Sequence, residues 1–238
     1  MTLLSLEHVS KAYTRGDRHR VVVLRDATLR VDRGEFAVVV GDPLAGKTTL
    51  LRIAAGLERP DQGRVRLDDE ELRVAGEVDR RVAVVARVAP PREMASMRMA
   101  DLLAVPLLDS APRREARARA TGAMGALGIE DLADASWEQL SDVERTLIRI
   151  ALATVRRPAV LLVDDPLPGL GLVHVDVVLR SLRRAALDDG AAVVVTVGDL
   201  AEAAHADAVH ILSAGSLTRA ARPDDRGQVV GFPAERRG

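Results

Sequence analysis

The stretch Gly41-Asp-Pro-Leu-Ala-Gly-Lys-Thr48 decides the fold, because it fits the pattern G-x-x-x-x-G-K-[ST]. In a loop of this kind, backbone N–H groups surround phosphate oxygens, the lysine neutralises their charge and the hydroxyl holds Mg²⁺. A chance glycine turn is the alternative. The context favours the phosphate loop, because the apolar run 36–40 before it has the composition of a strand and residues 48–57 after it have helical spacing.

The residues expected to contact a nucleotide lie in this loop and in the first turn after it: Gly41, Asp42, Pro43, Leu44, Ala45, Gly46, Lys47, Thr48 and Thr49. Lys47 is one of only two lysines in the chain. The loop therefore predicts a site for nucleotide phosphates.

A Mg²⁺ site in such a protein needs a second acidic group at the end of a neighbouring buried strand. The apolar run 159–163 ends in Asp164 and supplies one. Taken alone, Asp164 is equally an ordinary turn residue before Pro166. Its pairing with the loop favours the metal role, so Thr48 and Asp164 are the predicted Mg²⁺ ligands.

Composition sets the outer limits. The chain has 238 residues, is 47% hydrophobic and contains no cysteine, which suits one large domain and excludes disulfides and thiolate metal sites. The 34 basic and 35 acidic residues argue against nucleic acid as a partner, because no net charge attracts a phosphate backbone. Apolar runs fall far short of the roughly 18 residues of a membrane span, so the chain is not expected to cross a bilayer itself. The absence of cysteine is compatible with a reducing, cytoplasmic setting.

Hydropathy patterning predicts an α/β fold with a mainly parallel sheet. The Arg-rich run 112–127 is interpreted as the solvated face of a surface helix. The predicted strands cover 3–9, 21–31, 36–40, 63–67, 82–86, 159–163, 192–196 and 207–212, and the predicted helical regions cover 48–57, 97–156 and 173–187.

The two motifs, their spacing, the helical insert and the total length together resemble an ATP-binding cassette (ABC) transporter ATPase over residues 3–218. Residues 21–36 and 63–67 are most similar to the branch that serves macrolide export and lipoprotein release. The resemblance implies a P-loop NTPase fold with an antiparallel β subdomain and a helical subdomain at about 87–156. It places the α/β core at about 1–86 and 157–221 of one domain, 1–221, and leaves 222–238 as a flexible tail.

The same resemblance implies partners, a ligand and a location. ABC ATPases bind Mg-ATP, pair head to tail with a second ATPase subunit of the same or another kind, and dock on a membrane-spanning transporter subunit. The chain is therefore expected in the cytoplasm, on the inner face of the cell membrane. Tyr13 stands where the family has an aromatic residue that stacks on adenine; an ordinary surface tyrosine is the alternative.

Several family positions are altered in ways that predict weak hydrolysis. Arg87 stands where a glutamine contacts Mg²⁺ and water, and a guanidinium cannot accept a proton. Asp165, the candidate catalytic carboxylate, is one methylene shorter than the family's glutamate. Gly198 replaces a histidine that contacts the γ-phosphate, and Gly171 replaces the aspartate of the inter-subunit loop.

The family signature Leu-Ser-Gly-Gly-Gln is altered too, and it reads here Leu140, Ser141, Asp142, Val143 and Glu144. The spacing Ser-x-x-Glu is also a capping box, which predicts that the serine is satisfied within its own helix while two carboxylates occupy the first turn. A triphosphate would be repelled there.

Three functions are open to a cassette of this kind. The first is an ATP-binding subunit of a transporter with weak hydrolysis, and the alternative is a non-hydrolysing regulatory or scaffolding subunit. A cassette ATPase acting on DNA or in translation would need long insertions or a second cassette. A last expectation concerns Met94, Met97 and Met99, which stand where the family docks its membrane subunit; filling the subdomain core is the equal alternative.

Overall fold

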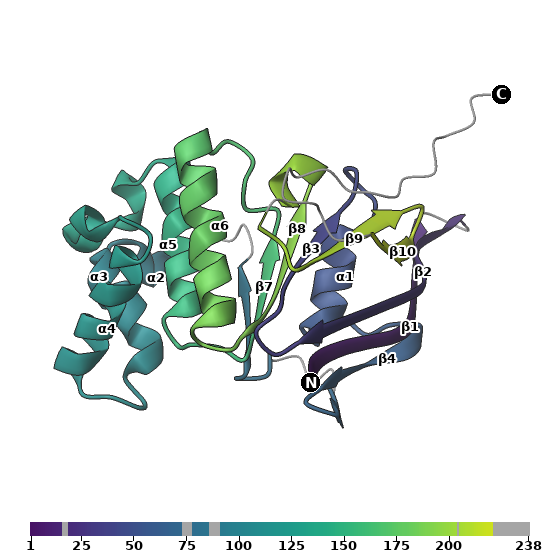
Figure 1. Ribbon diagram of the computed structural model, residues 1–238. Coiled ribbons are helices and arrows are strands. Elements are labelled where there is room, and N and C mark those ends of the chain that lie inside the picture. Colours follow the sequence, from purple (N-terminus) through teal and green to yellow (C-terminus); the bar gives the residue numbers. More distant parts are fainter. Residues whose placement is uncertain (16–18, 73–77, 86–90, 204, 221–238) are drawn as a thin grey trace.

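The structure is a computed structural model that describes residues 1–15, 19–72, 78–85, 91–203 and 205–220. These residues form two sheets, one of four strands in the order β2-β1-β4-β5 and one of six strands in the order β10-β9-β3-β8-β7-β6 (Figure 1). The strands are β1 Thr2–Arg15, β2 His19–Asp32, β3 Phe36–Val40, β4 Gln62–Leu67, β5 Glu70–Glu71, β6 Val82–Val85, β7 Val160–Asp164, β8 Ala192–Val197, β9 Ala208–Ser213 and β10 Ser216–Arg219.

The six-stranded sheet is parallel except at one edge. β3 pairs in parallel with β8 and β9, and β7 pairs in parallel with β6 and β8, whereas β10 is antiparallel to β9. Strands buried on both faces have the sequence of apolar runs; Phe36–Val40 is unbroken, and Ala192–Val197 is apolar except at Thr196. Because parallel strands end at the same edge, the loop after β3 and the last residue of β7 lie on either side of β8.

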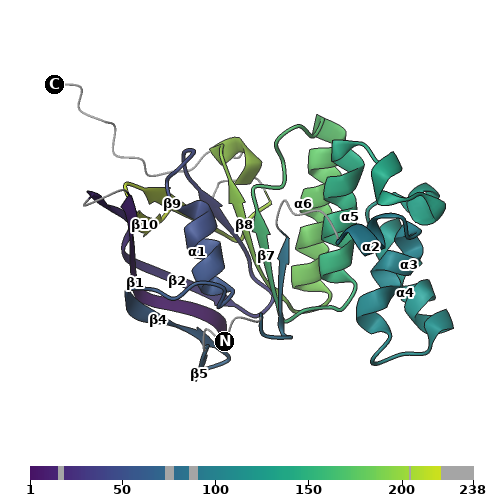
Figure 2. The same ribbon diagram turned by 180° about the vertical axis from the view of Figure 1, so that it is seen from behind.

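The alternating side chains of these strands pack into two layers. On one face, Val193 and Val195 join the core formed with helix α6 (Leu172–Leu187) and the helices of the middle region. On the other face, Ala192 and Val194 pack with helix α1 (Lys47–Ala54) and the antiparallel sheet. The central sheet therefore holds α1 from one side and α6 from the other (Figures 1 and 2).

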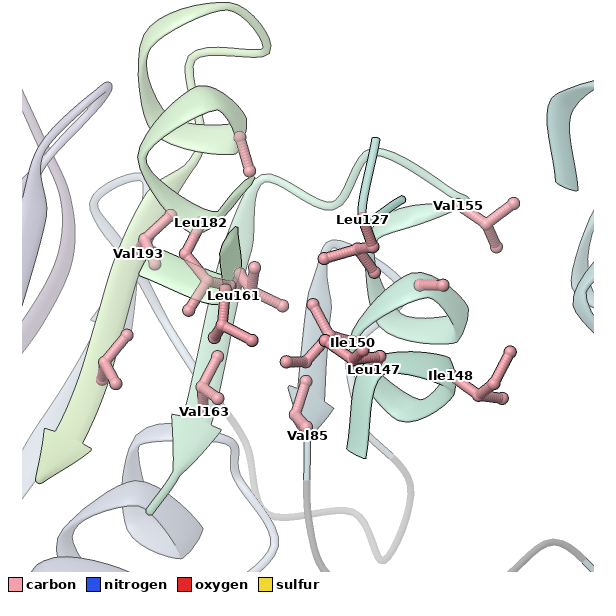
Figure 3. Packing of buried hydrophobic residues seen from close by; sticks show 14 of the residues in the cluster. Val85, Leu127, Leu147, Ile148, Ile150, Val155, Leu161, Val163, Leu182 and Val193 are labelled. Carbon is pink, nitrogen blue, oxygen red and sulfur yellow. The ribbon is translucent and has the colours of Figure 1, made fainter. Parts of the chain in front are cut away.

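The middle of the chain is helical, as expected, but is broken into short pieces. The helices of this region are α2 Arg92–Ala95, α3 Met99–Ala104, α4 Arg113–Gly125 and α5 Asp142–Thr154. The 3-10 turns between them are η1 Val105–Leu107, η2 Glu130–Asp134 and η3 Trp137–Gln139. A further 3-10 turn, η4 Leu200–Ala203, lies between β8 and β9. Helix α5 packs through Leu147 and Ile150 beside Val85 of β6 (Figure 3). The subdomain boundaries at 87–156 stay a prediction, and the tail 222–238 lies outside the described residues.

The Arg-rich run forms α4, and its arginines lie on the outside. Arg113, Arg114 and Arg119 are exposed, whereas Arg117 forms an ion pair with Asp101 of α3. The interpretation as a solvated helix face agrees with this placement. Two short strands were not anticipated: β5, and β10, which joins β9 through a tight turn with positive φ at Ala214 (48°) and Gly215 (82°).

Candidate nucleotide-binding site

The loop between β3 and α1 needs both of its motif glycines. A Cβ on Gly41 would lie 2.7 Å from the backbone oxygen of Leu212. Gly46 has φ 104°, a conformation that favours glycine, and a Cβ there would lie 2.9 Å from Cγ1 of Val23. The turn is completed by Leu44 at φ 69°, whose side chain is fully exposed. The backbone is thus shaped by close contacts that larger residues would break.

Helix α1 begins at this loop with an N-terminus suited to an anion. Gly46 precedes its first residue, no side chain caps it, and its first turn contains no acidic residue. The first N–H groups of a helix have no partner within the helix, and the dipole makes that end positive. The ammonium of Lys47 donates to the backbone oxygens of Gly41 and, at 3.1 Å, Asp42, which holds the positive charge against the loop.

The two predicted Mg²⁺ ligands are in direct contact. The hydroxyl of Thr48 donates to Oδ2 of Asp164 at 2.7 Å, although 116 residues separate them in the chain. Among the described residues no group of three or more His, Asp or Glu side chains gathers as a metal cage. A hydroxyl and one carboxylate suit Mg²⁺, which takes hard oxygen ligands and is usually held by one or two carboxylates together with phosphate oxygens.

Thr196 completes this cluster and was missed in the sequence. Its side chain is fully buried in β8, and its hydroxyl donates to Oδ1 of Asp164 at 2.9 Å while accepting from the backbone N–H of Asp165 at 3.0 Å. The strands place Thr196 directly opposite Asp164. The available signal was a single polar residue inside an otherwise apolar strand, next to a strand that ends in aspartate.

Asp165 follows Asp164 in a left-handed backbone conformation, with φ 46°. Aspartate is among the few residues that adopt this region readily. Its backbone N–H donates to the hydroxyl of Thr196, which fixes the main chain at this position to β8. Whether its carboxylate acts on water stays a prediction.

Tyr13 lies beside α1. Its hydroxyl donates to Oε1 of Glu58 at 2.6 Å and lies 3.3 Å from Oγ1 of Thr49, while the residue as a whole is 39% exposed. Burial, and after it the Glu58 carboxylate as hydrogen-bond acceptor, raises the pKa of Tyr13 above its ordinary value. The structure therefore brings the predicted base-stacking residue to the helix that follows the phosphate loop.

The altered signature begins helix α5, and its capping box is formed. Ser141 accepts from the backbone N–H of Glu144 at 3.3 Å, and the Glu144 carboxylate accepts from both the N–H and the hydroxyl of Ser141 at 2.7 Å. The hydrogen bond from the Ser141 hydroxyl, and after it the one from the Ser141 N–H, lowers the pKa of Glu144, so its carboxylate stays ionised. The side chain of Asp142 is 98% exposed, whereas Val143 packs partly against the core.

The structure does not bring residues 141–144 to the phosphate loop of the same chain. In both ribbon views, α5 and α1 lie on opposite sides of β7 (Figures 1 and 2). The N-termini of the two helices also differ chemically, since α1 is uncapped and free of acid whereas α5 is capped and carries Asp142 and Glu144.

The other altered positions are placed as follows. Arg87 lies outside the described residues. Gly198 follows β8, and Gly171 precedes α6; a Cβ at either position would meet no atom within 4 Å. Larger side chains would therefore fit at both.

The three methionines do not share one environment. Met99 is fully buried in the core of the middle region, which excludes it from a docking surface and supports the alternative for this residue. Met94 and Met97 are half-buried and pack against that core from outside. Within the described parts of the chain, no helix is long and apolar enough to cross a membrane.

Comparisons with known proteins agree with this geometry. A family model described as ABC transporter matches residues 24–168. The xylose/arabinose import ATP-binding protein XacK of Haloferax volcanii is 32% identical over 226 residues, which are 94% of this chain but only 59% of that relative. The lipoprotein-releasing system ATP-binding protein LolD of Chromohalobacter salexigens is 31% identical, over 91% of this chain and 93% of LolD.

Solved structures show the same fold. The dimeric structure of MJ0796, a bacterial ABC transporter cassette, superposes with a TM-score of 0.78 at 24% identity and covers 91% of this chain and 97% of that one. This likeness confirms the expected P-loop NTPase fold of ABC type, and the match to LolD agrees with the branch that residues 21–36 and 63–67 resemble. The chain therefore belongs to the ATP-binding subunits of the ABC transporter family.

Proposed function

We propose that the chain binds Mg-ATP at residues 41–49, couples the nucleotide state to a separate membrane subunit and hydrolyses ATP slowly. The observation that carries this proposal is the contact of Thr48 with Asp164 at the mouth of an uncapped helix N-terminus. Hydroxyl, carboxylate, lysine and free N–H groups converge at one edge of the sheet. That set complements phosphate and a divalent cation rather than a neutral ligand.

Each residue has a role in this proposal. The N–H groups of the loop and the Lys47 ammonium bind phosphate oxygens, and Tyr13 stacks on the adenine. Thr48 and Asp164 hold Mg²⁺, which when bound neutralises phosphate charge. Thr196 fixes the Asp164 carboxylate and the main chain of Asp165. Binding therefore draws on residues that the structure already holds in place.

Slow hydrolysis follows from the groups that would act on water. Asp165 is a short carboxylate on a constrained backbone. At Gly198 no side chain is available to contact a γ-phosphate, and Arg87 cannot accept a proton. General acid–base groups contribute about 10²–10⁴-fold to a rate, so their loss leaves binding while removing most of the chemistry.

A second candidate function is a non-hydrolysing regulatory or scaffolding subunit, which the closed capping box at Ser141 favours. The serine hydroxyl and the N–H of Glu144 are engaged within the capping box, and the pKa of Glu144 is lowered, which keeps its carboxylate ionised. In a head-to-tail pair this end would face a partner's triphosphate with negative charge. Composite sites built with this chain would then close poorly.

Partners and location belong to the same proposal. We infer a second ATPase subunit, either a copy of this chain or another protein, and a membrane-spanning subunit that keeps the chain on the inner face of the cell membrane. XacK is named for xylose/arabinose import and LolD for a lipoprotein-releasing system, so the relatives do not agree on one transported substance. The near-neutral charge and the ion-paired Arg117 give no support to a nucleic-acid partner.

The deciding experiment is a single-turnover assay with γ-labelled ATP and Mg²⁺ that records bound and cleaved nucleotide in one sample. Cleavage that Lys47→Ala abolishes identifies a working ATPase. ATP that is retained but not cleaved identifies the non-hydrolysing subunit. ATP that does not bind at all, with the chain folded by circular dichroism, rules out both.

A further inference from the structure

Tyr13 is held by its hydroxyl as well as by its backbone. The phenol donates to Glu58 at 2.6 Å and contacts the hydroxyl of Thr49 at 3.3 Å. Thr49 belongs to α1, and Glu58 lies four residues beyond the end of that helix at Ala54. A surface tyrosine with a free hydroxyl would rotate about its side-chain bonds, whereas this ring is fixed at its far end to the element that follows the phosphate loop.

Lys11 fixes the ring from a second direction. Its ammonium lies 5.5 Å from the centroid of Tyr13, over the ring. The ammonium is itself anchored, because it donates to the backbone oxygen of Arg59 at 2.7 Å and lies 3.3 Å from Oε1 of Glu58 and 3.6 Å from Oδ1 of Asp61. Because the Lys11 side chain is only 14% exposed and is bonded at its ammonium, it is held in place over the ring.

Tyr13 keeps surface that a ligand can reach. The residue is 39% exposed, although its hydroxyl is engaged and Lys11 lies over its ring. A ligand that stacks on the ring would therefore use the side away from Lys11. A flat aromatic surface of this kind suits a purine, since stacking requires one open face and a fixed orientation.

We infer that Glu58 is a positioning residue for the nucleobase: it holds Tyr13 and Lys11 so that the side of the ring away from Lys11 is presented to a purine, in register with the phosphate loop. This inference rests on the proposed function and deepens it. Glu58 touches no ligand itself and acts through Tyr13. The raised pKa of Tyr13 agrees with a phenol that is a permanent donor to this carboxylate.

The test compares two ligands that differ in the base. ATP uses both the ring and the loop, whereas inorganic tripolyphosphate uses the loop alone. Calorimetry with Mg²⁺ should show that Glu58→Ala weakens ATP binding by up to about tenfold, because a ring that is no longer fixed must be immobilised when ATP binds, at a cost of about 0.5–1.5 kcal/mol. Tripolyphosphate binding should change less than twofold.

A double-mutant cycle assigns the effect to the hydroxyl. In the Tyr13→Phe background, where the phenol is absent, Glu58→Ala should cost ATP affinity less than twofold. Glu58→Gln, which keeps an oxygen acceptor, should stay within about threefold of the unchanged protein. Arg52→Ala is the matched control, because Arg52 forms the other ion pair of Glu58, at 3.3 Å, without contacting the ring in any bond described for the structure.

Equal losses for ATP and tripolyphosphate, or an equal ATP loss in the Tyr13→Phe background, would overturn the inference. Should Glu58→Ala fail to fold, the absorbance titration of Tyr13, the only tyrosine in the chain, decides instead. Glu58→Gln should lower the pKa of the phenol, and an unchanged pKa would show that the contact is absent. The proposed function fails separately, if ATP binding is missing in the unchanged protein or survives Lys47→Ala.

Discussion

The hydroxyl of Thr196 donates a 2.9 Å hydrogen bond to Oδ1 of Asp164 from the neighbouring strand, at a point where the threonine is fully buried. The hydroxyl oxygen of Thr196 also accepts from the N–H of Asp165. One side chain thus fixes Asp164, the last residue of β7, and Asp165, which follows it. A single substitution in β8 should reach the proposed metal site without touching any residue proposed to contact the nucleotide.

Thr196→Val should destabilise the fold by about 1–3 kcal/mol, because the similar shape is kept while the carboxylate and an N–H lose their partner. Urea unfolding measures this loss of stability. The Mg²⁺ concentration needed for ATP binding should rise in the same variant. Thr154→Val is the control, since Thr154 bonds only backbone oxygens of its own helix, α5. Equal stability losses at the two positions would contradict the bridging role.

Restoring the altered catalytic positions should recover hydrolysis. Gly198→His has room, because a Cβ there meets nothing within 4 Å, and it is combined with Asp165→Glu. Asp142→Gly with Val143→Gly reopens the first turn of α5. The four changes together should raise single-turnover cleavage at least tenfold, given the size of general acid–base effects.

The glycine substitutions carry a cost of up to about 1 kcal/mol each in a helix, so the comparison is made well below the unfolding temperature. Gly122→His, at an equally open position on α4, is the matched control and should leave single-turnover cleavage unchanged. Cleavage that stays at the starting level would favour the non-hydrolysing subunit.

His210 should make the protein sensitive to acid. It is 5% exposed in β9, and its Nε2 has no hydrogen-bond partner among the described residues. Burial, and then repulsion from Arg219, lowers the pKa of His210 to about 4 from 6.5. Between these values the unfolded chain binds a proton that the folded chain does not, so stability present above pH 6.5 is lost as pH falls toward 4.

The loss amounts to about 3 kcal/mol over that window, from about 1.4 kcal/mol for each pKa unit. His210→Leu should remove this part of the pH dependence, as measured by urea unfolding at pH 7 and pH 4.5. His174→Ala, at an exposed position, should leave it intact. An unchanged pH dependence in His210→Leu would show that other groups cause the acid loss.

Met97 and Met99 should separate docking from core packing. Met99→Ala empties a fully buried position and should cost about 2–5 kcal/mol in a thermal or urea melt. Met97→Glu, at a half-buried position, should leave the chain folded but abolish co-purification with the membrane subunit. A chain that unfolds on Met97→Glu would place this residue in the core as well.

The site was predictable from the sequence where local pattern determines it. The loop between a strand and a helix, Asp164 at a strand end and the Ser141–Glu144 capping box depend on local spacing, and the structure places each where the sequence predicts it, while their roles toward a nucleotide stay predictions. Thr196 stands out in the sequence only as a polar residue in an apolar strand, and its bond to Asp164 depends on the register between β7 and β8. The bond from Tyr13 to Glu58 joins residues 45 apart and depends on how β1 passes α1.

The fold, too, was predictable where local pattern determines it and not where contacts between distant residues do. Buried parallel strands are recognisable in a sequence as apolar runs. The predicted ranges of β3, β7 and β8 therefore agree with the structure to within a residue or two. The short strands β5 and β10 carry no such run and exist because a neighbour supplies their hydrogen bonds. The middle region was helical in composition, but the turns that divide it are set by packing between helices.

Trp137, the only tryptophan, lies buried in η3 just before α5, with the guanidinium groups of Arg145 and Arg149 at 5.9 and 5.1 Å from its ring. Tyr13, the only tyrosine, stands on β1 beside α1. Two natural chromophores therefore stand in different parts of the molecule, Tyr13 beside the helix that follows the proposed phosphate loop and Trp137 in the helical region. The fluorescence of each can be measured without an added label. Energy transfer from Tyr13 to Trp137 would report the distance between the two side chains.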